Sequence, residues 1–173
     1  LVDTVTEKGP YATLKADVLS GCLAQTVTLS AEVRNASSYT WDFADGSLKQ
    51  TSDTFAIHQY LTAGVYTPSL IMKDGSGCSA TSDLSEKIVI DSLYIGINGI
   101  PSQICDSAIV SFVPRIESIA VSEMQKELQY KWDFGTATNN DTSDFHHPSF
   151  NYDVPGSYDV KLRGGSPYGC GQE

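Results

Sequence analysis

The sequence predicts an all-β protein made of two tandem β-sandwiches, and three observations lead to that expectation. Segments in which branched or aromatic residues alternate with polar ones recur along the chain, as in half-buried strands. Clusters rich in glycine and aspartate separate these segments and predict tight turns. The tripeptide Trp-Asp-Phe occurs at residues 41–43 and again at 132–134. A motif that recurs once per domain length indicates a duplicated fold.

The first copy has several predicted strands: 26–33 (TVTLSAEV), 38–43 (SYTWDF), 65–72 (VYTPSLIM) and 87–90 (KIVI). Turn signals stand between them at 44–46, 63–64 and 73–77. Several short strands separated by turns favour an antiparallel sandwich. Residues 116–128 (IESIAVSEMQKEL) fit a helix poorly, so a long hairpin is an equally good interpretation.

The repeat extends well beyond the tripeptide. Residues 58–70 align with 150–162 at a spacing of 92 positions, pairing Tyr60 with Tyr152, Gly64 with Gly156, Tyr66 with Tyr158 and Leu70 with Leu162. We therefore predict two domains, at 1–92 and 93–173. The second has no equivalent of the strand at 87–90, so we expect that another segment completes its sheet or that the chain is a fragment.

Four cysteines allow three disulfide pairings. If each copy folds by itself, equivalent cysteines play equivalent roles, which predicts one bridge between Cys22 and Cys78 and another between Cys105 and Cys170. Four buried free thiols are the alternative. A zinc site is less favoured, because no two cysteines stand two to four residues apart. Disulfides would place the protein outside the cytosol.

Composition excludes several classes of partner. Twenty-one acidic and eleven basic residues give a net charge of -10, which opposes binding to nucleic acid or to an anionic membrane surface. The apolar runs are far shorter than the roughly 20 residues of a transmembrane helix, so we expect no membrane insertion. The first residues lack the pattern of a secretion signal, so we expect that any such signal was removed or lies upstream.

The motifs WDFADG (41–46), His-x-Tyr (58–60), Ala-Gly-x-Tyr (63–66) and Gly-Cys (77–78) stand in a fixed order. Together they resemble the PKD (polycystic kidney disease) domain, an immunoglobulin-like sandwich found in tandem on cell-surface and secreted proteins. The resemblance is found in both copies, which together cover nearly the whole chain. The cysteines and the GSGCSAT stretch (75–81) are most similar to arrays in large surface proteins of gliding bacteria that use type IX secretion. The second copy departs from the family at GTATNND (135–141), which replaces the expected Gly-Asp-Gly turn.

The resemblance implies structural roles for the duplicated residues. Tryptophan and phenylalanine of each motif should build the core while the aspartate caps the next turn, which concerns Trp41, Asp42, Phe43, Trp132, Asp133 and Phe134. Tyr66 and Tyr158 resemble the tyrosine corner of related sandwiches, in which the phenol bonds back to nearby backbone.

Some PKD modules attached to hydrolases are thought to bind collagen or polysaccharide through exposed aromatic residues. We interpret Tyr39, Tyr94 and Tyr130 as unmatched between the copies and therefore as candidates for such contact, although scattered surface tyrosines are common.

Related modules also carry calcium sites, and carboxylate ligands are available from Asp42, Asp45 and Asp74. Turn capping explains these aspartates better, because the spaced acidic loop of a calcium site is missing. No other cofactor is expected.

The histidines His58, His146 and His147 match no catalytic motif, so we expect no enzyme. Bacteria with the suspected secretion system often O-glycosylate a serine or threonine between an aspartate and a small apolar residue, a pattern met by Thr4, Ser92 and Ser107. A three-residue pattern also arises by chance.

The sequence therefore predicts an extracellular spacer or stalk module of a larger bacterial cell-surface or secreted protein, such as a gliding or adhesion filament. Its partners would be neighbouring domains of the same chain. The alternative is an accessory adhesion module that binds polysaccharide or matrix protein.

Overall fold

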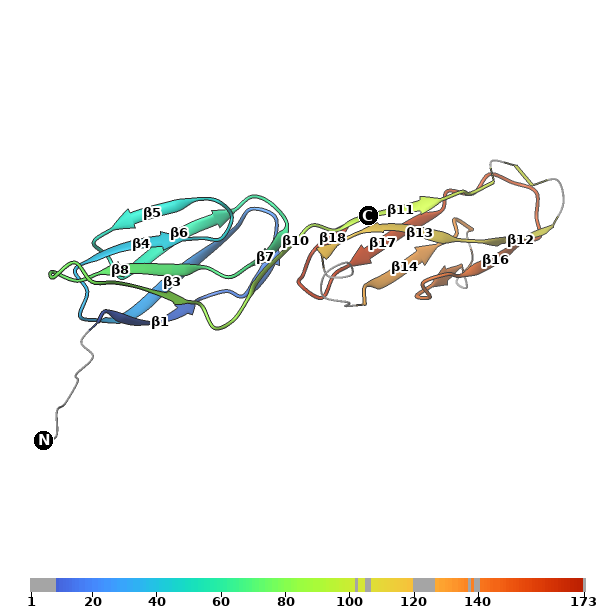
Figure 1. Ribbon diagram of the computed structural model, residues 1–173. Coiled ribbons are helices and arrows are strands. Elements are labelled where there is room, and N and C mark those ends of the chain that lie inside the picture. Colours follow the sequence, from blue (N-terminus) through green and yellow to red (C-terminus); the bar gives the residue numbers. More distant parts are fainter. Residues whose placement is uncertain are drawn as a thin grey trace, which may run out of the picture. The chain divides into compact units, whose positions relative to one another are not determined.

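The computed structural model describes residues 9–101, 103–104, 107–119, 127–136, 138 and 141–172. The chain divides into two compact units, residues 1–90 and 91–173 (Figure 1). Every element that the described residues form in full is a β-strand, which confirms the all-β prediction. Most of the segment 116–128 lies outside the described residues; its first two residues belong to a strand.

Unit 1 is built from three antiparallel sheets, with strand orders β1-β3-β6, β5-β4-β8-β9 and β2-β10-β7. The strands are β1 (Tyr11–Ala16), β2 (Ser20–Cys22), β3 (Gln25–Arg34), β4 (Ser38–Asp42), β5 (Leu48–Thr51), β6 (Phe55–Tyr60), β7 (Gly64–Tyr66), β8 (Ser69–Lys73), β9 (Ser79–Asp83) and β10 (Ile88–Asp91). The first two sheets pack their apolar faces together, because each strand alternates buried and exposed residues.

The register of unit 1 brings the apolar positions of neighbouring strands onto one face. Leu14 of β1 lies opposite Ala31 of β3, and Leu29 of β3 lies opposite Ala56 of β6. From the other sheet, Trp41 of β4 lies opposite Leu70 of β8, and both are fully buried. The core is therefore fixed by the period-two pattern, since a slip of one residue would turn every apolar side chain outward.

Unit 2 repeats most of this arrangement, with strand orders β11-β13, β12-β16 and β15-β14-β17-β18. Its strands are β11 (Tyr94–Asn98), β12 (Ala108–Ser111), β13 (Val113–Glu117), β14 (Gln129–Asp133), β15 (Thr142–Ser143), β16 (Ser149–Tyr152), β17 (Lys161–Gly165) and β18 (Gly171–Gln172). Trp132 of β14 lies opposite Leu162 of β17, the same pairing as Trp41 with Leu70. β12 and β13 together correspond to the long strand β3.

The cysteines differ from the predicted pairing. Cys22 and Cys170 each take part in a disulfide, whereas Cys78 is a free, exposed thiol, so the predicted Cys22–Cys78 bridge is wrong. Cys105 lies outside the described residues.

Geometry explains why Cys78 cannot reach Cys22. Cys22 ends β2, three residues before β3 begins, whereas Cys78 lies in the β8–β9 turn, beside the residues that follow the end of β3 (Figure 1). The ten residues of β3 separate these two ends by roughly 30 Å at about 3.3 Å per residue. A disulfide needs Cα atoms within about 7 Å.

Cys78 should react with iodoacetamide in the native, unreduced protein, while Cys22 and Cys170 should react only after reduction. Peptide mapping by mass spectrometry measures both. An unlabelled Cys78, or a Cys22 that is alkylated without reductant, would contradict this assignment.

Candidate functional site

The duplicated tripeptides lie in the interior of each unit. Trp41 and Phe43 are buried in unit 1, and Trp132 and Phe134 are buried in unit 2. These four aromatic residues are therefore core residues and present no ring to a ligand.

The aspartate of each tripeptide caps the turn that follows. The Asp42 carboxylate accepts a hydrogen bond from the Ala44 N–H at 2.8 Å, and the Asp133 carboxylate accepts one from the Gly135 N–H at 2.9 Å. Ala44 and Gly135 both have positive φ angles, 62° and 76°. A carboxylate that holds the N–H two residues ahead stabilises this left-handed backbone.

A stack of four rings is repeated in both units. In unit 1 it runs through Phe43, His58, Tyr60 and Tyr66, with centroid separations of 4.0, 4.8 and 4.5 Å. In unit 2 it runs through Phe134, Phe150, Tyr152 and Tyr158, with separations of 4.5, 4.9 and 4.4 Å. Offset and edge contacts at these separations each add about 0.5 to 1.5 kcal/mol beyond the buried area.

The third ring of each stack connects two sheets. The Tyr60 phenol of β6 donates to the Phe43 carbonyl, just after β4, at 3.0 Å. The Tyr152 phenol of β16 donates to the Phe134 carbonyl, just after β14, at 2.9 Å. Burial raises the pKa of both phenols above the ordinary value. Both therefore stay protonated and act as hydrogen-bond donors at neutral pH.

The fourth ring forms the contact expected of a tyrosine corner. The Tyr66 phenol donates to the Thr62 carbonyl at 2.9 Å, and the Tyr158 phenol donates to the Val154 carbonyl at 2.5 Å. A Cβ atom on Gly64 would lie 2.9 Å from the Tyr66 ring. The glycine two residues before the tyrosine is therefore needed for this close approach.

His58 belongs to a polar cluster with Asp45 and Ser47. The His58 Nε2 lies 2.7 Å from the Asp45 carboxylate, which also accepts a bond from the Ser47 hydroxyl. Burial opposes the charge of Asp45, but the bonds from Ser47 and His58 outweigh it and hold the pKa of this carboxyl below its ordinary value. Because Ser47 donates to Asp45 and not to His58, the cluster does not provide a serine nucleophile activated by a base.

The three aspartates considered as calcium ligands do not lie together. Asp42 ends β4 opposite Ser69, whereas Asp74 follows Lys73, which lies opposite Ser38 at the other end of β4. Asp74 caps its own turn, and hydrogen bonds from Ser76 and then from the Cys78 N–H lower the pKa of its carboxyl. Within the part of the chain that the structure describes, no group of three His, Cys, Asp or Glu side chains could hold a metal ion.

Two of the three candidate surface tyrosines are not free surface residues. Tyr39 and Tyr130 occupy equivalent positions, two residues before each tryptophan, so the interpretation of these two residues as unmatched is wrong. Tyr39 packs on the unit 1 core and donates to the Ala36 carbonyl, and Tyr130 packs on the unit 2 core and stacks on His146. Tyr94 is 45% exposed, with the Arg115 guanidinium 5.4 Å from its ring centroid.

The structure reveals an apolar pair that sequence reasoning missed. Phe55 and Ile57 of β6 are 51% and 55% exposed, on the face opposite to buried Ala56 and Tyr60. The segment FAIHQY carries apolar residues on both faces, so alternation alone could not show which face is buried.

The glycosylation candidates lie in different settings. Ser107 is exposed, and Thr4 lies outside the described residues. Ser92 is half-buried and follows Asp91, whose fully buried carboxylate accepts bonds from the Ser118 hydroxyl at 3.0 Å and the Ile119 N–H at 2.8 Å.

Replacing Tyr60 with Phe should lower the free energy of unfolding of unit 1 by about 1 to 2 kcal/mol, because a buried carbonyl loses its donor. Tyr152→Phe should do the same to unit 2. Urea titrations followed by the amide NMR signals of each unit measure this. Tyr11→Phe is the matched control, because the Tyr11 phenol is exposed. A Tyr60→Phe variant as stable as this control would contradict the assigned role.

Asp45→Asn should lower the free energy of unfolding of unit 1 at pH 7 by about 0.5 kcal/mol, since solvent screens the contact. The pKa of Asp45 is depressed in the folded protein, so its stabilisation is present above the unfolded pKa of about 3.9 and is lost as the pH falls through the folded value. The difference from the natural protein should therefore shrink as the pH falls below the unfolded pKa and vanish once Asp45 is protonated in the folded protein. Urea titrations between pH 2 and pH 7 measure it, with exposed Asp83→Asn as the control.

Comparison with known proteins identifies one part of the chain. The family model described as "PKD domain" matches residues 8–89. Among solved structures, the PKD1 domain of Vibrio anguillarum Epp is 23% identical, over 49% of this chain and 99% of that one, with a TM-score of 0.40. The PKD1 domain of the Vibrio cholerae metalloprotease PrtV is 25% identical over the same shares, also with a TM-score of 0.40. No curated protein matches the chain. The comparison thus finds a PKD domain at residues 8–89 of this chain.

Proposed function

We propose that the chain is an extracellular structural module in which two PKD-type sandwiches in tandem act as a spacer or stalk. It would belong to a larger bacterial surface or secreted protein, of the kind used in gliding or adhesion and exported by type IX secretion. Its working partners would be neighbouring domains of the same polypeptide.

The observation that carries this proposal is that the duplicated residues are buried and hold the fold together. Trp41, Phe43, Tyr60 and Tyr66 are all buried in unit 1, where they fill the core or connect its sheets. A duplicated binding site would instead repeat exposed side chains. The repetition of these motifs in both copies is therefore accounted for by the fold, as expected of a module whose task is mechanical.

The connection between the units also supports a spacer. Two residues, Ser92 and Leu93, separate β10 from β11. A connection this short has little of the conformational freedom of a flexible linker.

The described part of the chain contains no apolar helix of membrane-spanning length.

Adhesion is the second candidate function, and it is favoured by Phe55 and Ile57. Two neighbouring apolar side chains on the outer face of β6 offer an exposed apolar surface on which a sugar ring or a matrix protein could pack. Tyr94 with Arg115 offers a second exposed aromatic ring, in unit 2.

As a spacer, the protein should not co-sediment with insoluble cellulose, chitin or collagen, with calcium or with a chelator. An adhesion module should be retained on one of these materials. Retention that falls at least tenfold in Phe55→Ser or Ile57→Ser, but not in Leu48→Ser on exposed β5, would replace the spacer proposal with adhesion.

A further inference from the structure

The end of unit 1 near β7 is completed by β10. Ile88, Val89 and Ile90 of β10 lie opposite Tyr66, Val65 and Gly64 of β7, and the Val89 N–H donates to the Leu19 carbonyl, just before β2, at 2.9 Å. The side chains of Ile88 and Ile90 are fully buried in the core. β10 thus joins two short strands and supplies apolar side chains to the interior.

Unit 2 differs from unit 1 at this place. The spacing of the repeat makes residues 103–104 the counterpart of β2 and residues 156–158 the counterpart of β7, and neither forms a strand. No counterpart of β10 exists among the described residues. The two segments that lack strand structure are those that would pair with it.

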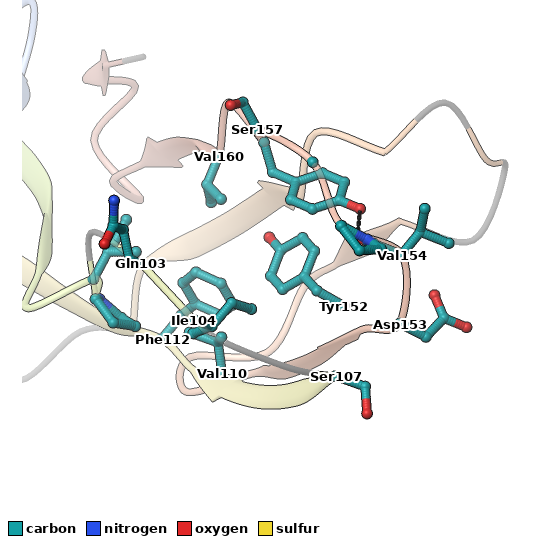
Figure 2. A pocket seen from close by; sticks show the side chains of 15 residues that line it. Gln103, Ile104, Ser107, Val110, Phe112, Tyr152, Asp153, Val154, Ser157 and Val160 are labelled. Atoms are coloured by element: carbon teal, nitrogen blue, oxygen red, sulfur yellow. Dashed lines mark hydrogen bonds between the residues drawn. The ribbon is translucent and has the colours of Figure 1, made fainter.

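An open cavity of about 700 Å³ lies between these two segments. Its wall is formed by Gln103, Ile104, Val110, Tyr152, Tyr158 and Val160, among others. Figure 2 shows Ile104, Val110 and Phe112 grouped beside the ring of Tyr152. We call this cavity the strand groove.

The side chains around the strand groove are less covered than their counterparts in unit 1. Tyr66 is buried, whereas Tyr158 is half-buried. Pro68 is fully buried, whereas Val160, at the equivalent position, is half-buried. The strand groove therefore exposes apolar surface that the β10 region covers in unit 1.

We propose that the strand groove is the docking site of one further extended strand with aliphatic side chains at alternate positions, like Ile88 and Ile90 of β10. The strand would pair with residues 156–158 on one side and with residues 103–104 on the other. Its two aliphatic side chains would cover Tyr152 and Tyr158.

The strand that docks belongs to the same polypeptide, as β10 does in unit 1. In unit 1, β10 follows β9 after four intervening residues, Leu84–Lys87, so the strand comes from the chain directly after the edge hairpin. A tethered strand also docks at a high effective concentration, which a short segment from another molecule lacks. This inference is separate from the spacer proposal, because co-sedimentation does not depend on it.

The test extends the full chain after Glu173 with SDLSEKIVIDS, the sequence of residues 82–92 that continues the repeat at its spacing of 92. Amide exchange at residues 156–158, measured by NMR, should slow at least tenfold. The same extension with serine at both isoleucine positions should leave the exchange unchanged. No slowing with the first extension, or equal slowing with both, overturns the proposal.

Two substitutions in unit 2, one inside the strand groove and one outside it, test whether the added strand docks there. Ile104→Arg places a charge in the groove at a residue that is 40% exposed, so the unit should fold but lose the slowing. Ile109→Arg, at a residue that is 73% exposed and outside the groove, should keep it. Equal slowing in both variants would show that the strand docks elsewhere.

A free peptide, acetyl-SEKIVIDS-amide, tests the source of the strand. Added to the unextended chain, it should shift signals of groove residues only at millimolar concentration. Tight binding of this peptide, combined with no slowing in the extended chain, would overturn the assignment of the donor to the same polypeptide.

Discussion

Each unit depends on one hydrogen bond between its sheets, from the phenol of Tyr60 to the Phe43 carbonyl and from that of Tyr152 to the Phe134 carbonyl. The acceptor carbonyl belongs to the last residue of the Trp-Asp-Phe tripeptide, so the bond fixes the place where the tryptophan strand ends. The capped turn starts there, and the ring stack is built around the donor. A lone carbonyl buried at this position would cost about 1 to 3 kcal/mol, which is a large share of the stability of a small domain.

The two units differ away from this contact. His58 in unit 1 corresponds to Phe150 in unit 2, and the turn after the tripeptide closes with Ser47 in one unit and with Asp141 in the other. The Trp132 indole N–H donates to the Phe145 carbonyl, whereas the Trp41 indole N–H is buried with no hydrogen-bond partner among the described residues. The hydrogen bond from the tyrosine phenol is thus kept in both units, although the neighbouring loops differ and His58 of one unit is replaced by Phe150 in the other.

The resemblance to the PKD domain implied the buried roles of the tripeptides and the two tyrosine corners, and the repeat assigned these roles to both copies. Prediction from the sequence failed where a side chain's role depends on contacts across the fold. Cys22 and Cys78 were paired by analogy between copies, which ignores the length of β3 between them. The interpretation of Tyr39 and Tyr130 as surface residues is wrong, because each lies on the face of its strand that holds the tryptophan. The sequence shows that the second copy has no counterpart of KIVI (87–90). It does not show the cavity beside Tyr152, because that cavity depends on how the segments on its two sides pack.

The position of β10 also affects how unit 1 can be isolated. The family match ends at residue 89, whereas β10 continues to Asp91, and the side chain of Ile90 is fully buried. A recombinant fragment cut to the matched residues would remove this isoleucine, and the loss of a buried aliphatic side chain costs about 2 to 5 kcal/mol. Domain libraries designed from family boundaries would therefore yield a destabilised version of this sandwich. The melting temperature of such a fragment would reflect the loss of Ile90 and would underestimate the stability of the intact domain.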